Sequence, residues 1–196
     1  MKNRTVRVIS AIALVAMASL TIPTVQAATN TGTGDIAGVP GDLTTSNTVT
    51  LTSATLALIK RAFLADGTAL ASGASMPKGT LVKFMIYINN NTTVGANDVS
   101  VRDALDAAFA YQTGTIKTSN TVANCAAAIC LPAEEAAIYA AVNAGTAKTD
   151  GTPDDEASYT AGTTTIDLGN QTVVTNSQLD VAASKVWAVL FTVKMQ

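Results

Sequence analysis

The sequence predicts an all-β protein: a β-sandwich with one short helix in an insertion and an extended arm at the N-terminus. Three observations indicate this class. Apolar and polar residues alternate with a period of two in several segments, and Gly, Asn and Thr-rich turns separate these segments. Helical features are confined to one stretch that begins at Pro132. Several short strands between turns, with a single helix, are typical of two packed sheets.

Residues 1–27 have the organisation of a cleaved export signal. Lys2, Arg4 and Arg7 precede the apolar run VISAIALVAMASL, and small residues lead to a cleavage position after Ala27. The apolar run is too short for a membrane anchor. We therefore expect a secreted, extracellular protein that has no membrane contact after cleavage.

The mature chain is mildly acidic. All 14 acidic residues follow residue 27, whereas three of the 12 basic residues lie in the signal, so its net charge is 9 − 14 = −5. This charge disfavours nucleic acid as a partner. The chain contains no His, which excludes Ser-His-Asp and Cys-His catalysis and a His-ligated metal. We expect no enzyme activity and no cofactor, with calcium as the one open question.

Residues 28–48 form the expected arm, because Gly, Thr and Asn dominate this stretch and it has almost no apolar pattern. The arm is predicted to be flexible and is a possible donor strand for a neighbouring molecule. The candidate assembly residues are the sizeable apolar residues of the arm and the two that come directly after it. They are Ile36, Val39 and Leu43 in the arm, followed by Val49 and Leu51.

The sandwich is predicted to span residues 49–196. Val49 and Leu51 alternate in one phase and Leu56 and Leu58 in another, which predicts a bulge or two short strands near Ser53. Residues 79–105 predict a hairpin, and residues 184–196 a final strand whose first half is apolar on both faces. Trp187, the single Trp, is interpreted as a core anchor and not as a platform for a sugar ring. The predicted core contains Phe84, Ile86, Ile88, Val99, Val101, Trp187, Val189 and Phe191.

An insertion is expected at residues 119–162. Cys125 and Cys130 are predicted to form a local disulfide, which is the default for two Cys in an exported protein. A helix is predicted to start at Pro132 and to end at Gly145. The acidic loop that follows is either a calcium site or a solvated loop, and its candidate ligands are Asp150, Asp154, Asp155 and Glu156.

Four segments carry a resemblance to a known family: MPKGTLVKFMIYINN, ANDVSVRDAL, IDLGN and KVWAVLFTVKM. In this order they resemble the immunoglobulin-like conserved-repeat domain of bacterial and archaeal surface proteins, a domain of unknown function. The family's Leu-Pro pair is Leu105-Asp106 in this chain. The resemblance implies a seven-stranded immunoglobulin-like sandwich on an extracellular surface or in a polymer, without catalytic residues. Its matching positions are Gly79, Phe84, Ile86, Ile88, Asn90, Val99, Val101, Asp103, Leu105, Leu168 and Gly169.

The leading functional hypothesis is a structural subunit of an extracellular filament or surface layer, which assembles with copies of itself. An arm ahead of a sandwich can complete the sheet of a neighbour by strand addition. This layout is similar to that of donor-strand pilins and bacterial matrix fibres. The alternative hypothesis is a monomeric extracellular module that binds a cell-surface sugar or protein.

Overall fold

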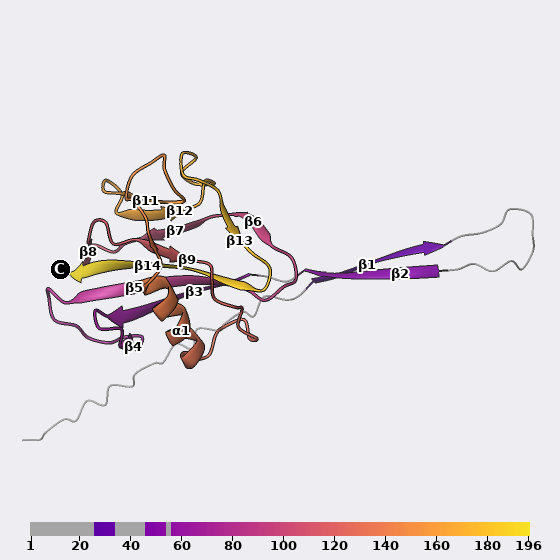
Figure 1. Cartoon of the computed structure of the whole chain (residues 1–196), viewed down its shortest axis with the longest axis horizontal. Helices are drawn as coiled ribbons and strands as arrows, with labels where there is room; N and C mark the ends of the chain where they lie inside the picture. Colours follow the sequence, from indigo (N-terminus) through magenta and orange to yellow (C-terminus); the bar gives the residue numbers. More distant parts are fainter. Residues whose placement is uncertain (1–25, 34–45, 54–55) are drawn as a thin grey trace, which may run out of the picture. The chain divides into compact units, whose positions relative to one another are not determined.

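The computed structural model describes residues 26–33, 46–53 and 56–196 (Figure 1). The chain divides into two compact units, Met1–Thr55 and Leu56–Gln196. The boundary falls seven residues after the expected start of the sandwich at residue 49, close to the phase slip near Ser53. Residues 1–25 of the expected signal lie outside the described residues.

The first unit contains a two-stranded antiparallel sheet. β1 (Gln26–Thr33) and β2 (Ser46–Ser53) pair along their whole length, with Gln26 opposite Ser53 and Thr33 opposite Ser46. All of the expected arm that the structure describes, residues 28–33 and 46–48, is therefore strand. Val49 and Leu51 belong to β2, whereas Ile36, Val39 and Leu43 lie outside the described residues.

The second unit is built on a large antiparallel sheet. Its central strand β5 (Leu81–Asn90) pairs with β14 (Lys185–Met195) on one side and with β3 (Ala57–Leu64) on the other. The strand order is β10-β9-β14-β5-β3-β4, and β8 also pairs with β14. The short strands are β4 (Ala69–Leu70), β8 (Phe109–Tyr111), β9 (Lys117–Ser119) and β10 (Thr146–Ala147).

Smaller sheets cover one face of the large sheet, and a helix covers the other (Figure 1). The smaller sheets have the orders β11-β12-β7 and β13-β6. This antiparallel arrangement confirms the predicted all-β sandwich with one helix. The strands are β6 (Ala96–Val99), β7 (Val101–Ala104), β11 (Ala157–Thr160), β12 (Thr165–Leu168) and β13 (Leu179–Val181).

The helix α1 (Pro132–Asn143) begins at the proline that the sequence placed in its first turn. Ile138 and Val142 are fully buried and attach it to the large sheet. A short Ala-rich helix needs such packing, because isolated helices of this length are marginal in water. In the described part of the chain, no helix has both the length and the apolar character needed to cross a membrane.

Two cores lie on the two faces of the large sheet, and β14 contributes to both. Trp187, Val189 and Phe191 face the smaller sheets, while Val186, Ala188 and Leu190 face α1 and the Cys loop. The strand is thus apolar on both faces because both faces are covered. Of the eight predicted core residues, six are buried in the core between the sheets, and Phe84 and Val99 are partly buried against it.

Candidate functional site

The outer edge of β3 is the first candidate site, because most of this strand has a partner on one side only. β5 pairs with β3 from Ala57 to Leu64. On the outer side, β4 pairs only with Ala62 and Phe63. Within residues 56–196, residues 57–61 have no neighbour on that side. The second unit therefore has an incomplete sheet edge of five residues.

The direction of the backbone groups on this edge follows from one hydrogen bond. The N–H of Leu64 donates to the carbonyl of Thr68 at 2.8 Å, on the β4 side. Backbone groups of a strand alternate in direction with a period of two, so those of Lys60 and Leu58 point to the same side. Their two N–H and two C=O groups can accept an added strand.

Within residues 56–196, β4 does not extend along this edge because the chain turns away directly after β4. The N–H of Ala74 donates to the carbonyl of Ala71 at 3.1 Å, and Gly73 has a φ of +81°. Glycine adopts this positive φ without the steric cost that other residues have. The turn therefore ends β4 at Leu70, before it can cover residues 57–61.

Two adjoining hollows lie beside β3: one meets β3 only at Ala62, which pairs with β4, and the other is lined by Lys60 and Arg61 of the edge. The first, of about 230 Å³, is mostly apolar and is lined by residues that include Leu70, Met76, Phe84, Phe109 and Met195. The other, of about 320 Å³, is lined by Lys60, Ala62, Leu70 and Phe84 among others. Phe84 and Leu70 line both hollows. Together the hollows can take aliphatic side chains from an added strand.

Lys60 stands at this groove and links the two layers. Its Nζ lies 2.6 Å from Oδ2 of Asp103 in β7 and 4.3 Å from the centre of the Phe84 ring. The Lys60 side chain remains 41% exposed. The Lys60 amine is therefore partly in solvent and partly engaged by Asp103, whose side chain is 12% exposed.

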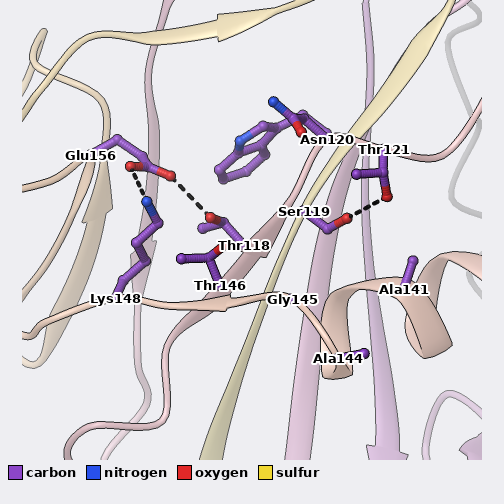
Figure 2. Close-up of a pocket in the computed structure, with 11 residues that line it drawn as sticks. Thr118, Ser119, Asn120, Thr121, Ala141, Ala144, Gly145, Thr146, Lys148 and Glu156 are labelled. Carbon is purple, nitrogen blue, oxygen red and sulfur yellow. Dashed lines mark hydrogen bonds and ion pairs between the residues drawn. The ribbon is translucent and has the colours of Figure 1, made fainter.

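A polar pocket of about 500 Å³ beside β9 is the second candidate site (Figure 2). Figure 2 shows Glu156 between Lys148 and Thr118, at 2.7 Å from Lys148 Nζ and 3.0 Å from Thr118 Oγ1. The hydroxyls of Ser119 and Thr121 lie 3.1 Å apart. The pocket also reaches the side chains of Asn120 and Trp187 and the end of α1. Its hydroxyl, amide and ion-paired groups can hydrogen-bond a polar, uncharged ligand.

The four acidic residues considered for calcium are each engaged by other groups. Asp150 accepts hydrogen bonds from the Tyr111 hydroxyl and the Gly114 N–H. Asp155 accepts from the N–H groups of Thr149 and Ala157. Asp154 accepts from the Thr149 hydroxyl, and Glu156 lines the polar pocket. Burial and the bond to Asp150 raise the pKa of Tyr111 above its usual value.

Among the described residues, the acidic loop does not form a compact cluster of three ligands. The cluster that does meet this condition contains Cys125, Cys130 and Glu134. Its two sulfurs are bonded to each other as a disulfide, as the sequence predicted. A disulfide sulfur is not the thiolate that binds metals, so this cluster is a structural feature.

Asn89 and Asn90, at the end of β5, are two residues whose role the sequence analysis missed. Asn89 exchanges hydrogen bonds with the backbone of Cys125 and also donates to the carbonyl of Ala127, so it holds the Cys loop. Asn90 donates to the carbonyls of Val94, Val181 and Ala182. Both side chains are buried. Side chains alternate between the two faces along β5. Continuing this alternation past Ile88 would have placed Asn89 and Asn90 on opposite faces of the sheet.

Comparison with protein-family models, with curated proteins and with solved structures finds no significant match to this chain. The resemblance to immunoglobulin-like surface domains therefore stays a prediction.

Proposed function

We propose that this protein is a secreted structural subunit of an extracellular filament or surface layer. In this proposal, the N-terminal segment of one subunit adds a strand to the sandwich of the next. Copies of the same chain are then both the donor and the acceptor, and the assembly needs no catalytic site, metal or nucleic acid.

The observation that carries the proposal is the presence of two complementary edges in one chain. β2 has eight residues and one strand partner, β1, within the described residues. The second unit has an unpaired edge in β3. Unpaired edges favour association with another strand, and a chain with one donor and one acceptor can propagate head to tail. The apolar hollows beside β3 add a place for side chains.

Sedimentation of two chains tests the proposal. The mature chain from Ala28 to Gln196 is expected to form filaments that pellet and are visible by negative-stain microscopy. A chain from Ser53 to Gln196 keeps both cores but lacks β1 and nearly all of β2, so it is expected to stay monomeric. If the shorter chain polymerises as well as the longer one, the donor segment lies elsewhere. If neither polymerises at high concentration, the protein is not a polymer-forming subunit.

The polar pocket favours a second candidate function, a module that binds a cell-surface sugar. Its volume of about 500 Å³ is within the range of ligand pockets, and hydroxyl and amide groups line it. Calorimetric titration of the monomeric chain with neutral oligosaccharides tests this function. Asn120→Ala is expected to weaken binding, whereas Asn91→Ala, at an exposed asparagine outside the pocket, is expected to leave it unchanged.

A further inference from the structure

We propose that residues 57–61 of β3 are the acceptor edge for β2 of a second copy, whose residues Val49 and Leu51 fill the groove beside Phe84. This inference rests on the proposed function and names its two surfaces. The occupant is a second copy of this chain because the chain itself supplies a strand of suitable length, pattern and charge.

The β3 edge is the best acceptor that the described strands offer. The second sheet layer has shorter strands, since β6 and β7 have four residues each. The outer side of β11 is met by the acidic loop, where Tyr159 N–H donates to the carbonyl of Asp150 at 3.0 Å. β10 consists of two residues. The β3 edge combines five unpaired residues with an adjoining groove, and its Leu58 side chain is 58% exposed.

β2 fits this edge by its sequence. Residues 46–53 read SNTVTLTS and carry no charge, so no unpaired charge would be buried when the strand is added. Aliphatic residues at 49 and 51 alternate with threonines at 48, 50 and 52. In a strand this pattern gives one aliphatic and one hydroxyl-bearing face. The aliphatic face suits the hollow beside Lys60, which is lined by Ala62, Leu70 and Phe84.

The register of a hairpin within one chain argues for addition between copies. Three residues, 54–56, connect Ser53 to Ala57, so a regular hairpin would pair Leu51 with Ile59 and Val49 with Arg61. Directly paired residues share one face. Ile59 and Arg61 lie on the α1 face, because Ile59 belongs to the core under α1 and Arg61 pairs with Glu135. The intramolecular register would thus turn the threonines toward the groove, whereas addition between copies leaves the register free.

A complementation experiment tests the inference separately from polymerisation. The donor chain is residues 28–196 with Leu58→Pro. Proline removes an N–H that points away from β5 and is tolerated at strand edges, so the substitution blocks the edge and keeps the β3–β5 pairing. The acceptor chain is residues 53–196, which contains both cores. We expect each chain alone to be monomeric and their mixture to form a one-to-one complex by sedimentation velocity.

Variants of the acceptor chain identify the edge. Leu58→Pro and Leu58→Lys in the acceptor are expected to abolish the complex, because an edge proline or lysine opposes strand addition. Val174→Lys is the matched control, because it also replaces an exposed aliphatic residue with lysine. Val174 lies at a turn and is 83% exposed, and the acceptor chain with this substitution is expected to bind the donor chain normally. Thermal melting of each variant verifies that it is folded.

The outcomes separate this inference from the proposed function. If the unmodified chain polymerises but the Leu58 acceptor variants still bind the donor chain, polymerisation uses another surface and this inference is wrong. If the unmodified chain does not polymerise but the one-to-one complex forms and needs Leu58, the filament proposal fails and the acceptor edge stands. If no complex forms and no polymer appears, the filament proposal and the acceptor-edge inference are both overturned. This outcome is also expected if β2 pairs with the β3 edge of its own chain.

Discussion

At the scale of single residues, buried polar side chains join elements that are far apart in the sequence. Arg61 Nε in β3 donates a bifurcated hydrogen bond to both carboxylate oxygens of Glu135 in α1, at 2.8 and 2.9 Å. The Tyr87 hydroxyl in β5 also donates to Glu135, at 2.8 Å. Tyr87 in turn accepts a bond from the N–H of Cys130 at 3.2 Å. One carboxylate and one phenol therefore connect the helix, the sheet and the Cys loop.

Tyr87→Phe is expected to destabilise the fold by about 1–3 kcal/mol, because it leaves a partly buried carboxylate with one donor fewer and a buried N–H without a partner. Burial, followed by the bond to Glu135, raises the pKa of Tyr87 above its ordinary value of 10.0. The stabilisation that this phenol contributes is complete below about pH 10 and is lost as the pH rises toward the folded-state pKa. Urea unfolding at about pH 8 and at about pH 11 should therefore show a smaller alkaline loss in Tyr87→Phe than in the unmodified protein.

Trp187→Ala and Phe84→Ala are expected to differ in their cost, although the sequence placed both residues in one core. Trp187 is buried between the sheets, so its removal should cost roughly 3–5 kcal/mol of unfolding free energy. Phe84 is only partly buried at the groove, and its removal should cost about 1.5–3 kcal/mol. Val174→Ala, at an exposed turn, is the control and should change stability by less than about 0.5 kcal/mol. Equal costs for Trp187 and Phe84 in chemical denaturation would contradict the open groove.

At the scale of elements, α1 is positioned by contacts at both of its ends. Its first turn is tied to the sheet through Glu135, and its last turn is tied to β9 by the Lys117 ammonium, which donates to the carbonyl of Asn143 at 2.6 Å. A cation is favourable at a helix C-terminus, where the carbonyl groups lack partners. The chain then passes close to β9 at Gly145 before it forms β10.

Gly145→Ala is expected to destabilise the protein, by about 1–3 kcal/mol, because a Cβ at this position would lie 2.3 Å from the carbonyl oxygen of Thr118. The backbone of α1 and β9 would have to move apart, which also disturbs the polar pocket. Gly151→Ala is the matched control, since a Cβ there meets nothing within 4 Å. In a thermal melting experiment, the Gly145 variant should have a lower melting temperature than the unmodified protein. The melting temperature of the Gly151 variant should be unchanged or slightly higher. An unchanged melting temperature of the Gly145 variant would mean that the backbone can move apart here without a loss of stability.

At the scale of the whole molecule, the stabilising features observed among the described residues are concentrated in the second unit. Both hydrophobic cores, the disulfide and the four ion pairs observed among the described residues lie within residues 56–196. The first unit has its own strand pairing and includes the whole predicted assembly segment. This division separates the unit that contains both cores from the unit that we propose to connect subunits.

Removal of residues before Ser53 is therefore expected to leave the melting temperature of the monomeric protein unchanged. The comparison must use a monomeric chain, and the donor chain with Leu58→Pro provides one. Calorimetry at equal concentrations should give coincident transitions for that donor chain and for residues 53–196 with the same substitution. A lower transition in the shortened chain would indicate that residues before Ser53 also stabilise the sandwich.

The sequence by itself determined the features that depend on local pattern. Alternation predicted β5 and both apolar faces of β14, and Pro132 predicted the start of α1. The presence of two Cys in a chain with an expected export signal predicted their disulfide. The tertiary structure alone decided which side of β3 lacks a partner within residues 56–196, which loops Asn89 and Asn90 hold, and that Glu135 faces Arg61 and Tyr87. These features depend on strand order and on contacts between residues that are distant in the sequence. The alternation of apolar and polar residues identifies a strand, but it does not determine which other strand pairs with it.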